Sequence, residues 1–114
     1  MPTRYYIRLP DPANARGGDP DLAFHSQGPD GLAAELQQAL RSDVLFERWR
    51  RMQDDPDEID PALGATDPTA RVDGEQHDLH IDLIVFTSLP SPVLRQRLGL
   101  LAGNAWQLRD VAAA

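Results

Sequence analysis

The stretch 78–86, Asp-Leu-His-Ile-Asp-Leu-Ile-Val-Phe, decides the fold class of this chain. Its apolar and polar residues alternate, with Leu79, Ile81, Leu83 and Val85 on one side and Asp78, His80 and Asp82 on the other. Successive side chains of a strand point to opposite faces of a sheet. The alternation therefore predicts a strand over 78–86 with one face in the core.

Four further segments have the pattern of strands. Residues 3–9 alternate in the same way and stop at Pro10-Asp11-Pro12, because proline cannot continue a central strand. Residues 69–73 predict a short strand that turns back at Asp73-Gly74, with Glu75 and Gln76 completing the turn. Residues 106–109 alternate as a final strand. Residues 22–26 predict a short additional strand, paired with the first in a long-looped hairpin.

Two helical segments separate these strands. The first opens at Gly28-Pro29-Asp30-Gly31, either with proline at the first helical position or with Asp30 as the N-cap. Its apolar stripe recurs every four residues. We expect a kink or a restart of the helix at Ser42-Asp43, after which a second stripe follows. The second segment begins at Ser91-Pro92 and stops at Gly103. The residues of the three stripes are Leu32, Leu36, Leu40 and Val44; Leu45, Trp49 and Met52; and Leu94, Leu98 and Leu101.

The elements follow one another in the order β(β)αββαβ, which predicts a single α+β domain over 1–114. We expect a mainly antiparallel sheet of four or five strands, with the two helical segments on one face, in ferredoxin-like order. Strands 3–9 and 78–86 are then antiparallel central neighbours. Residues 10–20 and 54–68 are long loops rich in proline and acidic residues, and 112–114 form a frayed tail.

Composition excludes several functional classes. The 114 residues carry a net charge of −7, with 18 acidic residues against 11 arginines and no lysine, and such a surface disfavours nucleic acid and anionic membranes. The lack of cysteine excludes disulfides, thiolate catalysis and cysteine-bound zinc. The first nine residues lack the apolar region of a signal peptide, and no apolar run has the length of a membrane span. We therefore expect a cytoplasmic protein without a cofactor.

The uncovered face of the expected sheet is the first candidate site. Opposite charges on facing strands contribute about 0.2–1 kcal/mol per pair. One interpretation is a solvated face whose charges neutralise one another, and the other is an interface for a partner protein or a second copy. Ile84 and Phe86 extend the face with apolar surface and favour the interface. The residues of this face are Arg4, Tyr6, Arg8, Asp78, His80, Asp82 and Arg109.

The loop 54–68 carries a second candidate surface. Its acidic residues, Asp54, Asp55, Asp57, Glu58 and Asp60, resemble a calcium-binding loop in composition. They lack the spacing and the central glycine of an EF-hand, so a solvated loop is the better interpretation. Its charge suits a basic partner.

Histidine and carboxylate side chains at 77–82 raise the hypothesis of a zinc or iron site. In a strand Asp78 and Asp82 lie about 13 Å apart, His77 points to the face opposite His80, and nearby arginines repel a cation. We therefore expect no metal.

Thr87-Ser88 precede a helix and present hydroxyl and N–H groups that suit an anion. No Gly-x-Ser-x-Gly nucleophile motif is present.

The sequence thus predicts a small acidic protein that is not an enzyme, an interaction or regulatory module that forms a homodimer. Its expected partner is another protein or a second copy, with no nucleic acid and no membrane. The alternative is a small-molecule or metal-binding protein, or an enzyme, that uses His80 with Asp78 or Asp82.

Overall fold

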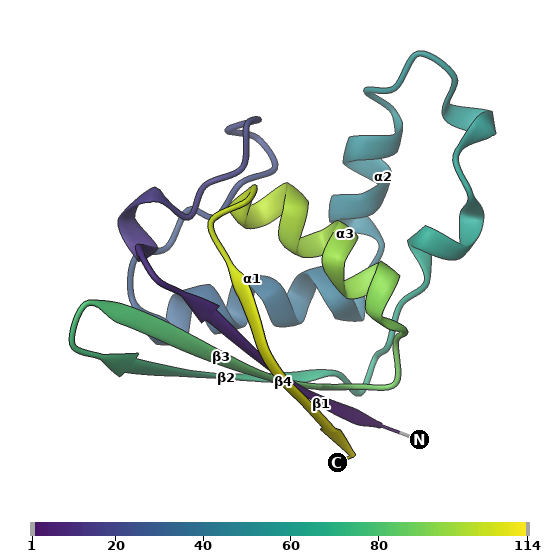
Figure 1. Cartoon of the computed structure of the whole chain (residues 1–114). Helices are drawn as coiled ribbons and strands as arrows, with labels where there is room; N and C mark the ends of the chain where they lie inside the picture. Colours follow the sequence, from purple (N-terminus) through teal and green to yellow (C-terminus); the bar gives the residue numbers. More distant parts are fainter. Residues whose placement is uncertain (1, 114) are drawn as a thin grey trace.

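Two antiparallel strands form the centre of the sheet. In the computed structural model, which describes residues 2–113, these are β1 (Thr3–Leu9) and β3 (His80–Thr87). β2 (Arg71–His77) pairs with β3, and β4 (Gln107–Ala113) pairs with β1, both antiparallel. The sheet order is therefore β2-β3-β1-β4, as Figure 1 shows. The prediction of an α+β domain with 3–9 and the 78–86 region as central neighbours is confirmed.

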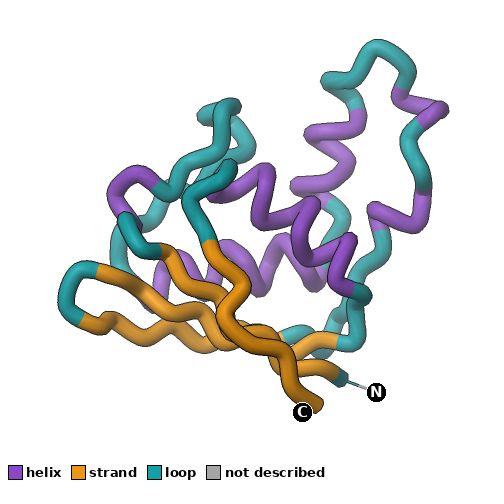
Figure 2. The backbone as a smooth tube through the Cα atoms, viewed as in Figure 1, coloured by secondary structure: helices purple, strands orange, loops and turns teal. Residues whose placement is uncertain are grey.

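Two helices, α1 (Pro29–Arg41) and α3 (Ser91–Ala102), cover one face of this sheet and leave the other uncovered (Figures 1 and 2). A third helix, α2 (Val44–Arg50), packs against α1 and extends away from the sheet. Short 3-10 turns occur at η1 (Pro12–Asn14), η2 (Pro56–Glu58) and η3 (Pro61–Gly64). None of the helices in residues 2–113 has the length and apolar character that crossing a membrane requires.

The core lies between the sheet and the helices. Alternate residues of β1 and β3 are buried, and they meet the leucine stripes of α1 and α3. The Tyr5 hydroxyl donates a buried hydrogen bond of 3.2 Å to the Leu89 carbonyl, which ties β1 to the segment before α3. The alternation of the sequence therefore sets which face of the sheet the helices cover. The core members of these elements are Tyr5, Ile7, Leu9, Ile81, Leu83, Val85, Leu32, Leu36, Leu40, Leu94, Leu98 and Leu101.

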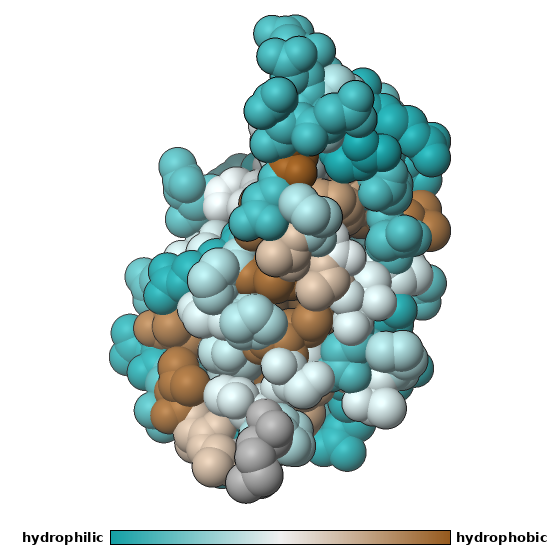
Figure 3. Space-filling view, turned by 90° about the vertical axis from the view of Figure 1, so that its right-hand side faces the viewer, coloured by the Kyte–Doolittle hydropathy of each residue, from teal (hydrophilic) through white to brown (hydrophobic). Residues whose placement is uncertain are grey.

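A buried arginine attaches the loop 54–68 to the helices. Arg97 is 0% exposed, and its guanidinium donates to the carbonyls of Leu63 at 2.6 Å, Ala65 at 3.0 Å and Ala39 at 3.2 Å. Burial lowers the pKa of Arg97 below its ordinary value, while the charge of Asp43 opposes that change. The far part of the loop projects from the domain and is mostly hydrophilic, as the top of Figure 3 shows.

The β2–β3 hairpin differs from the prediction. β2 runs through Asp73-Gly74, and the chain turns at Asp78-Leu79 instead. Gly74 serves close packing, because a Cβ at this position would clash with the Pro29 carbonyl at the start of α1. Asp78 adopts a positive φ of 51°, which aspartate tolerates better than most residues. Leu79 is consequently 87% exposed at the tip of the hairpin and not in the core.

The predicted strand at 22–26 is absent from the described residues. Leu22, Ala23 and Phe24 are buried, but the segment packs over the helices as an irregular strap. The Phe24 amide donates to the Leu101 carbonyl at 2.9 Å, and the Glu35 carboxylate accepts hydrogen bonds from the next two amides. The apolar residues of this segment are buried against the helices and not in the sheet, because the segment has no neighbouring strand to pair with.

Two smaller predictions also change. The helix does break near Ser42-Asp43, but Val44 and Met52 are 57% and 52% exposed, and Phe46 is the buried residue of α2. Because α2 does not continue the axis of α1, the apolar stripe of α1 does not extend to Val44. β4 extends to Ala113, so residues 112–113 pair with β1 and are not frayed, whereas the rest of the expected tail lies outside the described residues.

Candidate functional site

The uncovered face of the sheet presents four rows of side chains. Each row runs across the strands and consists of residues that are paired with one another. Most predicted face residues lie here, on the central strands and at a bulge in β4. Asp78 does not, because it forms the hairpin turn. From one end to the other the rows are Arg71, Phe86, Arg4 and Ala112; Asp73, Ile84, Tyr6 and Asp110; Glu75, Asp82, Arg8 and Gln107; and His77 with His80.

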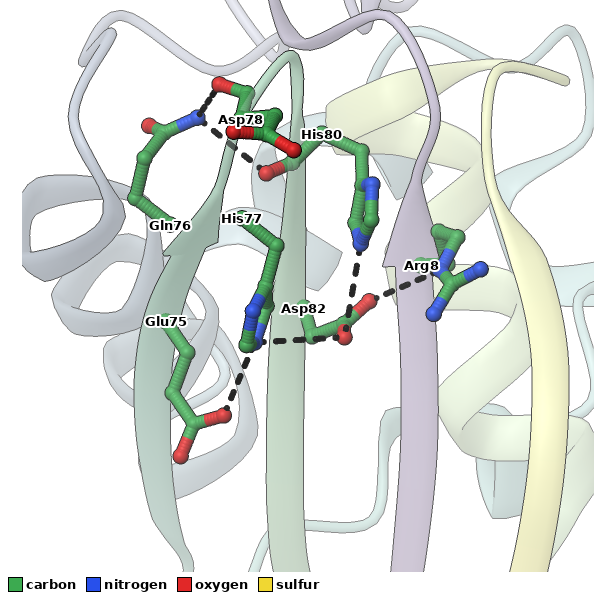
Figure 4. Close-up of polar contacts among 7 residues, drawn as sticks. All are labelled: Arg8, Glu75, Gln76, His77, Asp78, His80 and Asp82. Atoms are coloured by element: carbon green, nitrogen blue, oxygen red, sulfur yellow. Dashed lines mark hydrogen bonds and ion pairs between the residues drawn. The ribbon is translucent and has the colours of Figure 1, made fainter.

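Asp82 is the centre of a polar cluster at the hairpin end of this face (Figure 4). Arg8 Nε donates to Asp82 Oδ1 at 3.0 Å. The Nε2 atoms of His77 and His80 both stand 3.7 Å from Asp82 Oδ2, and His77 Nε2 also lies 3.2 Å from Glu75 Oε2. One carboxylate therefore connects side chains from β1, β2 and β3.

The two histidines share a face, contrary to the prediction that His77 points away from His80. They end the facing strands of a hairpin and are directly paired, with stacked rings whose centroids are 5.4 Å apart. Gln76 braces the turn between them, since its side-chain amide donates to the carbonyls of Asp78 at 2.9 Å and His80 at 3.1 Å. The turn predicted at Asp73-Gly74 caused the error. It placed both histidines in one continuous strand, where residues three positions apart point to opposite faces.

β2 contributes four face residues that sequence reasoning missed, namely Arg71, Asp73, Glu75 and His77. Alternation of charged residues from 71 to 77 was the available signal. The Asp73-Gly74 pair, a common turn signal, concealed it. With these residues the face holds four arginines and four carboxylates, and its formal charge is zero in a chain of −7.

These charges are unevenly distributed across the face. The β2–β3 half has three carboxylates and one arginine, whereas the β1–β4 half has three arginines and one carboxylate. A hollow of about 390 Å³ on the acidic side is lined by Asp73, Glu75 and Asp82 among others. A second hollow of about 240 Å³ is lined by Arg8 and Arg109 together with Asp82 and Asp110. The face is therefore a patch with one negative and one positive half.

Apolar and cationic side chains alternate with the carboxylates in the middle of this face. Tyr6, Ile84 and Phe86 are only partly buried. The Arg71 guanidinium stacks over the Phe86 ring at 4.2 Å, and that of Arg4 lies 5.4 Å from the Tyr6 ring. Such aromatic and arginine side chains are enriched at protein interfaces.

Two buried nitrogens of this face lack a hydrogen-bond partner. Arg4 Nε and His80 Nε2 are both shielded from solvent and make no hydrogen bond within the described residues, although His80 Nε2 lies 3.7 Å from Asp82 Oδ2. Buried polar groups are hydrogen-bonded in the great majority of cases, so an unpaired one needs an explanation. Both atoms belong to side chains of the uncovered face.

The two histidines are also candidate ligands for a metal ion. Across residues 2–113, no group of three or more histidine, aspartate or glutamate side chains has an arrangement able to hold a metal ion. The cluster instead joins histidines and carboxylates to Arg8, whose charge opposes a cation.

The anion site expected at Thr87-Ser88 is filled by the chain itself. Asp67, 6% exposed, accepts hydrogen bonds from the Thr87 hydroxyl at 2.8 Å and the Ser88 amide at 3.0 Å, and from Thr69 at its other oxygen. Burial alone raises the pKa of the Asp67 carboxyl, but these hydrogen bonds outweigh it and hold the pKa well below its ordinary value. Asp67 thereby joins the start of β2 to the end of β3.

The acidic residues of the loop 54–60 lie far along the projecting segment and are all exposed. Asp60 Oδ1 accepts a hydrogen bond of 2.9 Å from the Ala62 amide and caps η3. The other four make no hydrogen bond or ion pair through their side chains within residues 2–113. Their role as a surface for a basic partner stays a prediction.

Comparison of the chain with protein-family models, with curated proteins and with solved structures finds no match in any of the three.

Proposed function

We propose that this chain is a non-enzymatic protein-interaction module that works as a homodimer joined through the uncovered face of its sheet. The observation that carries the proposal is the charge of that face, which is zero although the chain carries −7. Two copies therefore meet there without net repulsion between the surfaces in contact. The apolar centre at Tyr6, Ile84 and Phe86 supplies surface to remove from water.

A second copy suits this face better than an unrelated protein of one charge. A two-fold interface uses the same patch on both copies, so the patch must complement itself. A patch with one acidic and one basic half meets that requirement.

The size of the face sets the expected strength of the dimer. Four strands spaced about 4.8 Å apart, each of about seven residues at about 3.3 Å, cover roughly 440 Å² in projection. Side-chain relief increases this area, but it remains below the roughly 800 Å² per partner of a standard interface. We therefore expect a dissociation constant in the micromolar range, about −8 kcal/mol.

The test is the oligomeric state of the protein and of two matched variants. Sedimentation equilibrium over about 1–200 μM, a range that brackets a micromolar dissociation constant, should show a dimer for the wild type. Ile84→Asp places a charge at the centre of the face and should give a monomer. Val44→Asp makes a similar change at an exposed position on α2 and should leave the dimer intact.

A wild type that stays monomeric at the highest concentration contradicts the proposal. So does a dimer that Ile84→Asp leaves unchanged, because the contact would then lie elsewhere. Circular dichroism of both variants checks that the fold is retained.

Two further parts of the proposal concern fold family and location. The succession of β1, α1, β2, β3, α3 and β4 with sheet order β2-β3-β1-β4 supports a ferredoxin-like arrangement. The cytoplasmic location and the regulatory role expected from the sequence belong to the same proposal.

A further inference from the structure

The distribution of charge on the uncovered face restricts how two copies can meet. If the two-fold axis runs parallel to β1 and β3, each copy places its β2–β3 half over the β1–β4 half of the other. If the axis runs across the strands, β2 lies over β2 and the like-charged halves coincide. The first arrangement joins an acidic half to a basic half at both ends of the interface, whereas the second joins acid to acid and base to base.

Arg109 is the side chain best placed to cross this interface. It lies at the irregularity where β4 shifts register against β1, at the level of Arg8 and Tyr6. Its side chain makes no ion pair or hydrogen bond with any residue in 2–113, although the chain has 18 acidic residues. An exposed arginine at a bulge, which re-aims the side chain, is free to reach a partner.

The acidic hollow is the matching receptor. Asp73, Glu75 and Asp82 line it from β2 and β3, and Arg4 lines it from β1, so the hollow holds three carboxylates against one guanidinium. Within residues 2–113, the side chain of Glu75 contacts the His77 ring at 3.2 Å and no arginine, and Asp73 lies 3.6 Å from Arg71. Rotation about an axis along the strands keeps each row at its own level, so Arg109 of one copy arrives at the level of Glu75 and Asp73 of the other.

We infer that the two copies pack with their two-fold axis along the central strands, so that Arg109 of each copy enters the acidic hollow of the other beside Glu75. This inference rests on the proposed homodimer and adds its orientation and its specificity residues. Guanidinium binds carboxylate in a fixed, bidentate geometry, which suits the selection of one orientation.

Charge exchange tests the contact between Arg109 and Glu75. Arg109→Glu and Glu75→Arg should each weaken the homodimer at least about tenfold, since like charges then face each other twice per dimer. An equimolar mixture of the two variants should recover wild-type affinity as a heterodimer, in which both contacts again join opposite charges. Arg95→Glu on α3 and Glu58→Arg on the projecting loop make the same charge changes elsewhere and should leave the affinity within about twofold, as expected for screened surface charges.

A spin-label distance tests the orientation. The chain has no cysteine, so Leu79→Cys gives one labelling site, and this position is exposed at the hairpin tip. With the axis along the strands, both tips lie at the same end of the dimer, about 14 Å apart at sheet separations of about 10 Å. With the axis across the strands they lie at opposite ends, about 25 Å apart. Electron paramagnetic resonance separates the two cases.

The outcomes separate the existence of the homodimer from its orientation. A short distance together with recovery in the mixture supports the inference. A dimer that Ile84→Asp disrupts, but that shows the long distance or no response to Arg109→Glu, overturns the orientation and keeps the interface. A wild type that is monomeric throughout overturns the proposed function and the inference with it.

Discussion

Replacing Arg97 by alanine is expected to destabilise the domain by about 3–5 kcal/mol. The side chain is fully buried on α3, and its guanidinium donates to the carbonyls of Ala39, Leu63 and Ala65 and to Gln96 Oε1. It also lies 5.1 Å from the Phe46 ring. No carboxylate within residues 2–113 forms an ion pair with it. Its charge is therefore satisfied almost entirely by main-chain oxygens.

The magnitude follows from what the substitution leaves behind. Three main-chain carbonyls lose their donor, and each buried unsatisfied acceptor costs about 1–3 kcal/mol. The removed volume adds a cavity cost. Loss of the buried charge offsets part of this sum, because its desolvation no longer opposes folding. The net of about 3–5 kcal/mol corresponds to a fall in Tm of at least about 10 °C for a domain of this size.

Thermal and urea unfolding followed by circular dichroism measure the effect. Arg97→Met separates the hydrogen bonds from the packing, because it keeps most of the apolar stem and removes every donor. It should lose at least about 2 kcal/mol. Arg95→Ala is the matched control, since Arg95 is exposed on the same helix and its Nε donates to the Ser91 hydroxyl. It should change the stability by no more than about 0.5 kcal/mol.

A fully stable Arg97→Met variant would refute this reasoning. That result would mean that the desolvation of the guanidinium costs as much as its hydrogen bonds contribute, as happens for some buried ionic groups. The attachment of the loop through the carbonyls of Leu63 and Ala65 would then make no net contribution to stability.

Two further predictions concern Asp67 and Gly74. The depressed pKa of Asp67 means that its contribution is present above the unfolded pKa of about 3.9 and is lost as the pH falls toward the lower folded pKa. Asp67→Asn should therefore be less stable at neutral pH and lose less stability between about pH 4 and pH 2, and parallel curves of urea midpoint against pH would contradict this. Gly74→Ala should cost about 1–3 kcal/mol because its Cβ meets the Pro29 carbonyl. Gly18→Ala, which meets nothing within 4 Å, should be tolerated, and equal urea midpoints for the two variants would rule out the close-packing explanation.

Local patterns were sufficient to predict most of the fold. The two-residue alternation in 3–9 and 80–86 and the leucine stripes of α1 and α3 are properties of short segments, and they survive into the structure. The turn was not predictable in the same way. Asp73-Gly74 has turn chemistry, but the glycine is used to let the start of α1 approach β2, a contact between residues 45 positions apart in the chain.

The candidate site could be predicted only in part for the same reason. Five of its seven residues come from the central strands, where alternation identifies the face, and the structure keeps Arg4, Tyr6, Arg8, His80 and Asp82 there. Arg109 also lines the face, but only the bulge of β4 determines its level. Asp78 leaves the face, and the residues of β2 join it, because hairpin register decides which side chains meet.

The sequence by itself determined the α+β class, the two faces of the central strands and the net charge of −7, since each follows from residue type and local spacing. Tertiary structure alone decided that His77 and His80 stack, that Asp82 joins three strands and that the arginines and carboxylates of the uncovered face separate into two halves. These are relations between strands. They depend on register, and a shift of one residue would send each side chain to the opposite face.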